Sequence, residues 1–209
     1  MGERNSAGRR GLEPPAEATL HGPEEDVRLM LAFRAGDAAA FEALFRRWSG
    51  PLLRFLERMV RDLATAEELV QEVFIRVHGA RDRYRPEARF STWLYRIATN
   101  LALNELRRPR HRAPHYSTDA EDAPPLPADG PRADDVADAR RQGQRAQQAL
   151  VELPENQRAA LWLAAVEGLS YAEIAEALEV TEAAVKSLVH RARGALSERL
   201  GAPGPEGGT

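Results

Sequence analysis

Apolar residues between positions 24 and 108 recur every three or four positions, the spacing that places them on one side of a helix. In the segment 64–78 the apolar positions are Leu69, Val70, Val73, Phe74 and Val77. No window in this block shows the sustained alternation of a strand. The pattern therefore predicts an all-α bundle over residues 24–108.

Candidate capping residues divide this block into five predicted helices. Asp26 is expected to cap a first helix, and Asp37 a second that ends near Trp48. Pro51 is expected to open a third helix, because proline at the first helical position loses no needed hydrogen bond.

The last two helices of the block are assigned by the same reasoning. Thr65 with Glu68 three residues later resembles a capping pair, and Ser91 precedes the apolar run that begins at Trp93. The predicted fourth and fifth helices therefore start at these residues.

Residues 154–199 predict three further helices, of which the last two have helix-turn-helix spacing. Ser170 and Glu173 form a predicted capping box for the first helix of this pair. Glu179 and Val180 leave room only for a sharp turn, after which Thr181 is expected to cap the final helix.

The final helix has an apolar side and a basic outer side. Its predicted buried residues are Ala184, Val185, Leu188 and Ala192. Its outer residues are Lys186, Ser187, His190, Arg191 and Arg193. A short helix with such a face suits the major groove of DNA, although an ordinary three-helix bundle with a solvated face fits the same pattern.

Composition marks the segments between and beyond the helical blocks. Residues 1–23 and 201–209 are rich in glycine, proline and charge, which predicts a disordered N-terminal arm and a disordered tail. Residues 109–133 have too little apolar content to pack and predict a flexible acidic linker. Helix is expected to resume near residue 134 and run to 153. The fold class is therefore all-α, with two small helical domains, 24–108 and 134–200, joined by the linker.

The net charge of −3 conceals a strong segregation along the chain. Residues 90–112 hold five arginines and one acid, whereas residues 116–138 hold seven acids and one arginine. Because the local field governs phosphate binding, the total charge does not argue against a nucleic-acid partner.

Several classes of site are excluded or unsupported. The chain has no cysteine, which excludes disulfides, thiolate zinc sites and a thiol nucleophile. The histidines do not form metal-binding pairs, and no glycine-rich phosphate loop follows a strand. No cofactor, metal or catalytic residue is predicted. Neither a secretion signal nor a membrane span is evident, so we expect a soluble, cytoplasmic protein.

Three polar surfaces remain for binding, two on predicted helices and one on a predicted loop. Glu68, Gln71, Glu72 and Arg76 form one polar face in 64–78, which is either solvated or a docking face for a partner helix. Asn100 and Asn104 lie one turn apart on one face of a predicted helix. Asparagine has a low helix propensity, so the pair needs a reason. Their amides can read the edges of DNA bases. Nearby arginines that can hold phosphates are Arg96, Arg107 and Arg108.

The loop 82–90 joins cationic and aromatic side chains, a combination that suits an unstacked base. These residues are Arg83, Tyr84, Arg85, Arg89 and Phe90.

Three of these segments together resemble one family. Residues 69–77, 90–108 and 153–193 are similar, in this order, to the core-polymerase-binding, −10 and −35 regions of bacterial extracytoplasmic-function sigma factors. The resemblance implies a dissociable promoter-specificity subunit of RNA polymerase, without catalytic activity, that serves a stress- or signal-responsive set of genes. It also implies three partners: core RNA polymerase through its beta and beta-prime subunits, promoter DNA, and an anti-sigma factor.

The resemblance assigns roles to individual positions. Core polymerase binding falls to Glu68, Leu69, Gln71 and Glu72. Contacts to the −10 element fall to Arg83, Arg85, Arg89, Phe90, Trp93, Arg96, Asn100, Asn104, Arg107 and Arg108. Contacts to the −35 element fall to Ser170, Tyr171, Thr181, Lys186, Ser187, His190, Arg191 and Arg193.

Two other functions fit parts of the sequence. A stand-alone helix-turn-helix regulator would use only the C-terminal unit, and a helical adaptor would leave every basic face solvated. For a sigma factor the two promoter elements lie about 70 Å apart, at 34–36 Å per helical turn. A linker of about 25 residues reaches about 80–90 Å when extended, but left free it prefers about 25–30 Å. The isolated protein is therefore not expected to hold both domains at promoter spacing.

Overall fold

A computed structural model describes residues 23–108 and 148–201, and within these ranges the regular structure is entirely helical. The elements are α1 (Pro23–Arg34), α2 (Ala38–Val60), α3 (Leu63–Ala80), the 3-10 turn η1 (Arg81–Arg83), α4 (Phe90–Leu106), α6 (Glu155–Ala165), α7 (Tyr171–Leu178) and α8 (Glu182–Leu200). A further helical segment, residues 148–151, precedes α6. The predicted all-α fold class is confirmed.

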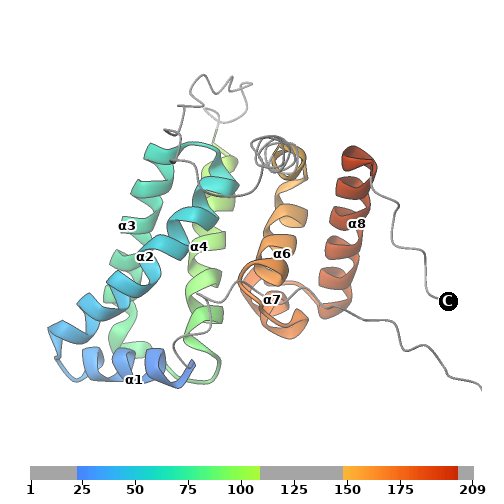
Figure 1. Cartoon of the computed structure of the whole chain (residues 1–209). Helices are drawn as coiled ribbons and strands as arrows, with labels where there is room; N and C mark the ends of the chain where they lie inside the picture. Colours follow the sequence, from blue (N-terminus) through green and yellow to red (C-terminus); the bar gives the residue numbers. More distant parts are fainter. Residues whose placement is uncertain (1–22, 109–147, 202–209) are drawn as a thin grey trace, which may run out of the picture.

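Helices α1–α4 form the first unit. Helix α2 packs against α3 and α4, which also pack against each other, while α1 crosses the lower end of the bundle (Figure 1). The centre of this unit is fully buried and includes Leu44, Leu52, Phe55, Val73 and Leu94. This core fixes the direction in which α3 and α4 present their polar faces.

Helices α6–α8 form the second unit, in which α8 packs against α6 and α7. The predicted capping box is present: the Glu173 amide donates to Ser170 Oγ at 3.3 Å, and the Ser170 amide donates to Glu173 Oε2 at 2.8 Å. Glu179 ends α7 in the left-handed conformation, with φ 55° and ψ 43°, and Thr181 Oγ1 accepts from the Ala184 amide at 3.2 Å. The helix-turn-helix prediction is confirmed.

The predicted break at Pro51 is wrong, because α2 continues through it as one helix of 23 residues. A proline in a helix interior costs about 3 kcal/mol. Burial outweighs this cost, since Leu44 before the proline and Leu52 and Phe55 after it enter the same core. The N-cap at Asp37 is as predicted, and its Oδ1 accepts from the Ala39 amide at 2.9 Å.

Three other predicted caps are wrong. Asp26 lies inside α1, which begins at Pro23, so that the predicted arm, 1–23, is one residue too long. Helix α3 is capped by Asp62, whose Oδ2 accepts from the Thr65 amide at 2.7 Å, so Thr65 is not the cap. Helix α4 begins at Phe90 without any side-chain cap, so Ser91 already belongs to its first turn.

Asp26 is instead a buried structural residue. Its Oδ1 lies 3.0 Å from Arg47 Nη1 and accepts a hydrogen bond from Trp48 Nε1 at 3.2 Å. The carboxylate thus joins α1 to α2, because a buried charge must be paired.

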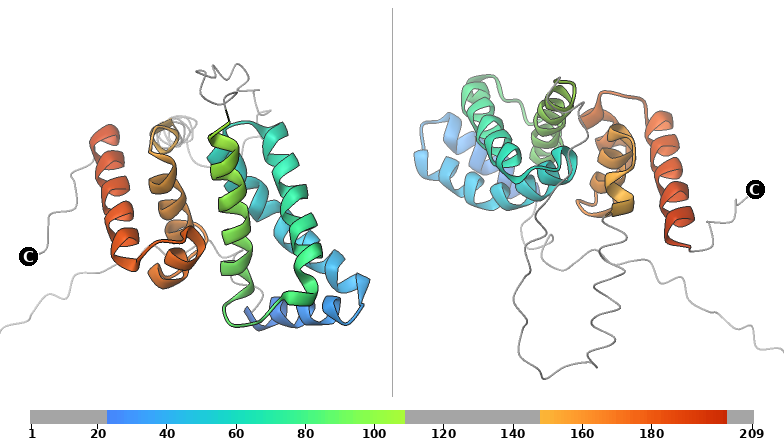
Figure 2. Two further views of the ribbon diagram at one scale, coloured as in Figure 1. Left: turned by 180° about the vertical axis from the view of Figure 1, so that it is seen from behind. Right: turned by 90° about the horizontal axis from the view of Figure 1, so that it is seen from above.

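The two units pack against each other. Helix α4 contacts α7, and the C-terminal end of α2 contacts α6. Seen from the front and from behind, α6 and α7 lie between α4 and α8 (Figures 1 and 2). Sequence reasoning predicted two tethered domains and no such contact. The linker 109–133, most of the arm, residues 134–147 and the tail after Gly201 lie outside the described residues, so those predictions stay predictions.

Candidate nucleic-acid interface

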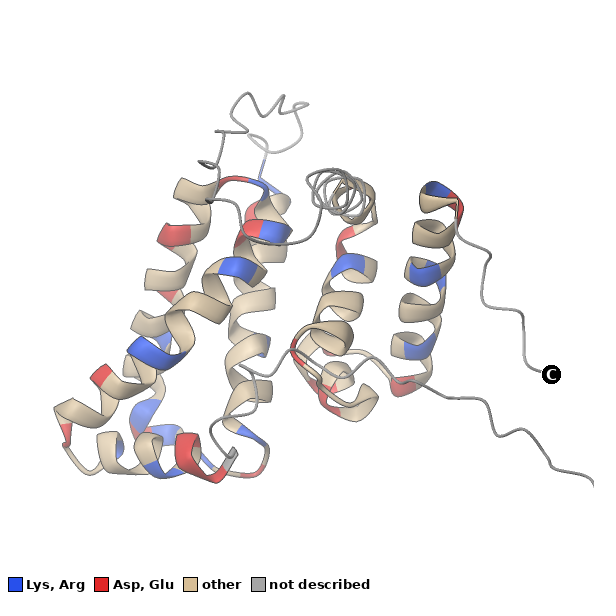
Figure 3. Cartoon of the chain, in the orientation of Figure 1, with Lys and Arg blue, Asp and Glu red and all other residues tan. Residues whose placement is uncertain are grey.

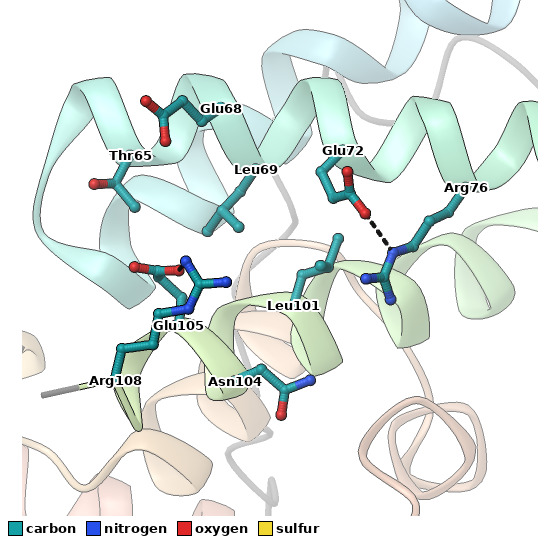
Figure 4. Close-up of a pocket in the computed structure, with 9 residues that line it drawn as sticks. All are labelled: Thr65, Glu68, Leu69, Glu72, Arg76, Leu101, Asn104, Glu105 and Arg108. Carbon is teal, nitrogen blue, oxygen red and sulfur yellow. Dashed lines mark hydrogen bonds and ion pairs between the residues drawn. The ribbon is translucent and has the colours of Figure 1, made fainter.

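A groove of about 430 Å³ lies between α3 and α4 (Figure 4). Its lining brings together predicted core-binding and predicted −10 residues: Thr65, Glu68, Leu69, Glu72, Arg76, Leu101, Asn104, Glu105 and Arg108. Glu72 Oε1 pairs with Arg76 Nε at 2.9 Å on one side of the groove. On the other side, Arg108 Nη1 pairs with the buried Glu105 Oε2 at 2.8 Å.

Three of the four predicted core-binding residues line this groove, at different depths. Leu69 is buried and contributes apolar surface to its wall, while Glu68 is exposed at its rim. Gln71 is exposed on α3 but does not line the groove. The face therefore combines acidic groups with a small apolar floor.

The side of α4 that faces α7 carries charged and polar contacts between the units. Arg89 Nε lies 3.2 Å from Glu173 Oε1, and Arg96 Nε lies 4.0 Å from Glu179 Oε1. Asn100 Nδ2 donates to Glu179 Oε1 at 3.5 Å. Positions 89, 96 and 100 fall on one stripe of a helix, because seven and eleven residues are close to whole numbers of turns.

Asn100 and Asn104 do not share one surface, contrary to the prediction. Asn100 is directed to Glu179 of α7, whereas Asn104 lines the groove toward α3. Four residues advance a helix by about 400°, so each such step rotates the side chain by about 40°. The rotation is enough here to place the two amides in different environments.

The loop before α4 is less open than its composition predicts. Tyr84 and Phe90 are buried, so Phe90 is a core residue in this structure, and its contact to DNA stays a prediction. Trp93 is half-buried and packs edge-on against Tyr84, with ring centroids 5.1 Å apart. Arg83 and Arg85 remain exposed.

Burial also governs the ionisation of two tyrosines in the first unit. It raises the pKa of Tyr84, with a smaller contribution from Asp26. It raises the pKa of Tyr95 more strongly, and there the second contribution comes from Glu167 of the second unit.

The outer side of α8 presents the predicted basic residues. Lys186, His190, Arg191 and Arg193 are exposed, and Arg and Lys positions lie along α8 in Figure 3. The Ser187 hydroxyl accepts from Arg191 Nη2 at 2.8 Å and from Nε at 3.2 Å, which fixes the direction of the guanidinium.

The buried side of α8 differs from the prediction at Val189. Val185, Val189 and Ala192 are buried, whereas Ala184 and Leu188 are half-buried. Val189 lies four residues after Val185, and this spacing was the signal that could have identified it.

Three other predicted −35 residues lie around the start of the helix pair. Ser170 and Thr181 are exposed, but each hydroxyl serves as a helix cap. Tyr171 is half-buried and packs against the core of the second unit. The exposed residues of the predicted −35 set whose side chains do not serve as helix caps therefore lie on α8.

A second contact between the units was not predicted and centres on Arg158 of α6. Its Nη1 donates to the backbone oxygens of Arg58 at 3.0 Å and Met59 at 2.9 Å, and its Nη2 to the Leu153 oxygen at 3.1 Å. The side chain is buried at the C-terminal end of α2, where the helix dipole favours a cation.

Burial, with a smaller contribution from the neighbouring Arg61, lowers the pKa of Arg158 to about 10, and Glu155 opposes the shift. Arg61 itself donates through Nη2 to the Val151 oxygen of the second unit. Burial also lowers the pKa of Arg61, while Glu152 and Glu155 act in the opposite sense. Two arginines therefore cross this contact in opposite directions.

Comparison with known proteins identifies both units. The sigma-70 region 2 family matches residues 44–112, and the sigma-70 region 4 family matches residues 143–196. The chain belongs to the extracytoplasmic-function RNA polymerase sigma factors. The first unit of this sigma factor thus corresponds to region 2 and its second unit to region 4.

Two relatives illustrate the breadth of the similarity. The sigma factor is 34% identical over 183 residues to the RNA polymerase sigma-H factor of Pseudomonas aeruginosa, covering 85% of this chain and 94% of that one. It is 33% identical over 175 residues to the ECF RNA polymerase sigma factor SigW of Bacillus subtilis, covering 80% and 92%.

A solved structure supports the fold. The sigma factor RpoE of Bartonella quintana, in complex with the anti-sigma factor NepR, matches with a TM-score of 0.58 at 25% identity, covering 77% of this chain and 96% of that one. Across residues 23–108 and 148–201, no helix is long and apolar enough to span a membrane.

Proposed function

We propose that this sigma factor binds core RNA polymerase through the α3–α4 groove, the −10 element through α4, and the −35 element through α8. The observation that carries the proposal is the separation of two DNA-type faces on two units. One is the α4 stripe with Arg89, Arg96 and Asn100, and the other is the basic outer side of α8. A stand-alone regulator needs only the second face.

The roles within each surface follow from chemistry. On α4, amides suit base edges and arginines suit phosphates, and Arg107 extends the polar positions beyond its C-terminal end, whereas Asn104 and Arg108 lie on the side of the groove. On α8, Arg191 and Lys186 approach the major groove with the arginine oriented by Ser187. The acidic and apolar groove residues Glu68, Leu69 and Glu72 suit a helical surface of the beta-prime subunit, with Gln71 at its side.

The proposal includes a regulatory partner and a cellular setting. The protein acts in the cytoplasm without catalytic chemistry of its own, and polymerase performs the reaction. An anti-sigma factor is the expected partner, because a similar chain has been solved in complex with one.

Transcription with purified core polymerase tests the proposal. Core with and without this protein is incubated with a library of genomic fragments from the source bacterium, and the 5′ ends of the transcripts are sequenced. We expect new start sites that share two upstream elements about 70 Å apart along the duplex. A protein that neither co-elutes with core nor creates any start site would contradict the proposal.

A further inference from the structure

Two arginine side chains from distant segments meet on one backbone oxygen, where α1 crosses the end of the first unit. Arg34, the last residue of α1, donates from Nη1 to the Tyr84 oxygen at 3.2 Å. Arg85, in the loop before α4, donates from its own Nη1 to the same oxygen at 3.3 Å. Two guanidinium groups therefore lie close together at this junction, although like charges repel each other.

The shared oxygen is held in place by the aromatic ring of Tyr84. This residue is 3% exposed, and its ring packs against those of Trp93 and Phe90 with centroids 5.1 and 6.3 Å apart. Because Phe90 begins α4, the contact between Tyr84 and Phe90 closes residues 85–89 into a loop between two buried residues. Moving the start of this loop away from α1 would expose the aromatic surface.

No carboxylate balances the two charges. Within residues 23–108 and 148–201, neither Arg34 nor Arg85 forms an ion pair. Of the nearby acids, Asp82 lies 3.6 Å from Arg81, and Glu87 is exposed and pairs with neither arginine. Both arginines are exposed, and each uses one of its five N–H donors on the Tyr84 oxygen, so the remaining donors are available to a ligand.

We propose that Arg34 and Arg85 together bind one phosphate of the promoter strand. Guanidinium groups donate well to phosphate oxygens, and an anion between two of them removes their mutual repulsion. That the phosphate belongs to promoter DNA rests on the proposed function of α4 and of the loop before it. Sequence reasoning assigned no DNA contact to α1, and the site adds this helix to the interface.

The site extends the proposed −10 surface beyond the N-terminal end of α4. Arg89 lies at the other end of the loop, on the stripe that runs along α4, and the ring contact between Tyr84 and Phe90 brings the two ends of the loop together. A strand that follows the stripe toward Phe90 therefore reaches Arg85 and Arg34 next. A phosphate contact there fixes the register of the strand and carries no sequence preference.

The variant Arg34→Gln tests the site in the full-length chain. Glutamine keeps an N–H donor for the Tyr84 oxygen but removes the charge. The matched control is Arg28→Gln, which removes one charge from an exposed position of the same helix, where the arginine is already paired with Glu25. Binding of dye-labelled oligothymidine of about 12 nucleotides is followed by fluorescence anisotropy between about 50 and about 200 mM salt.

The salt dependence separates a phosphate contact from a purely structural role. Loss of one phosphate contact on a single strand lowers the slope of log affinity against log salt by about 0.7. If the contact contributes nothing at 1 M salt, Arg34→Gln should bind about eightfold more weakly at 50 mM and about threefold more weakly at 200 mM. Arg28→Gln should stay within about twofold of the wild type. If Arg34 only held the loop, its loss would shift the line without changing its slope, and this result would overturn the inference.

A double-mutant cycle tests whether the two arginines share one phosphate. Arg85→Gln alone should cause a loss similar to that of Arg34→Gln. The double variant Arg34→Gln/Arg85→Gln should then be within about twofold of either single variant, because the shared contact is already lost. Effects that multiply would mean two separate phosphates and would contradict the shared site.

Failure of the inference can be distinguished from failure of the proposed function. If Arg34→Gln keeps the wild-type slope, or if the wild type does not bind the strand, the two-arginine site is refuted, while transcription with core polymerase still decides the proposed function. If the slope falls as expected but the wild type neither binds core nor directs initiation, the two arginines bind a phosphate and its assignment to promoter DNA is refuted.

Discussion

Replacing Arg158 with methionine is expected to separate the two units. The form in which they are in contact is called the closed form, and the separated one the open form. Methionine keeps the apolar stem of the side chain but removes the guanidinium that bridges the units. Two of its hydrogen bonds, to the oxygens of Arg58 and Met59, cross between the units, whereas the third, to Leu153, stays within the second unit. Only the first two contribute directly to closure.

The expected size of the effect follows from these two bonds. A hydrogen bond from a charged group contributes about 1.5–3 kcal/mol. The lower value applies because burial lowers the pKa of Arg158 to about 10, so the charge loses hydration in the closed form. Two bonds then give about 3 kcal/mol, or a change of about 150-fold in the ratio of closed to open protein.

The direction of the pKa shift of Arg158 supports the lower free energy for each hydrogen bond. For a base, a lowered pKa means that the folded environment disfavours the charged form. The desolvation of Arg158 therefore opposes closure at every pH below about 10 and is relieved only as the pH rises above that value. At neutral pH the hydrogen bonds must offset this cost.

Energy transfer between labels on Glu57→Cys in α2 and Leu200→Cys in α8, two exposed positions of a chain without cysteine, measures the closed fraction, with Arg199→Met as the control. Arg199 also forms an ion pair, at 2.9 Å to Glu152, but the pair is exposed and lies within the second unit. Its loss should change stability by less than about 1 kcal/mol and leave closure unchanged. Far-UV circular dichroism confirms that both variants remain helical. If Arg158→Met is no more open than Arg199→Met, the assignment of Arg158 to closure is refuted.

Three further predictions concern the groove, the outer side of α8 and the buried Asp26. Glu72→Ala should weaken binding to core polymerase about tenfold in fluorescence anisotropy, whereas the exposed Glu67→Ala, outside the groove, should not. Arg191→Ala should spare core binding, reduce initiation from promoters that depend on the −35 element, and lower the salt slope of duplex binding by about 1. Asp26→Ala leaves Arg47 without its buried partner and should lower the free energy of unfolding by about 3 kcal/mol, measured by urea denaturation.

Features that depend on neighbouring residues could be predicted from the sequence. The caps at Asp37, Ser170 and Thr181 involve backbone amides two or three positions away, so the pattern contains all of the interacting groups. The helix-turn-helix was predictable for the same reason. The basic outer side of α8 followed from periodicity alone.

Features that depend on distant residues could not be predicted in this way. Pro51 has the local signature of a helix start, and only the shared core of Leu44 and Phe55 shows why α2 continues. Phe90 among arginines resembles a base-stacking residue, yet its burial is decided by packing against Trp48 and Trp93.

The contact between the units was equally invisible in the sequence. The partners of Arg158 include backbone oxygens 99 and 100 positions earlier, and no side-chain pattern marks a backbone oxygen as an acceptor. The ion pairs of Glu173 and Glu179 join residues that each look solvated by themselves.

Glu179 places the stability of a helix end and the contact between the units in opposition. Its left-handed backbone favours glycine, and glycine there would relieve about 1 kcal/mol of conformational cost. The same change would delete the carboxylate that contacts Arg96 and Asn100. A more stable end of α7 would therefore come together with a weaker contact between the two units, so a search for heat-resistant variants at this position would also select for units that separate more readily.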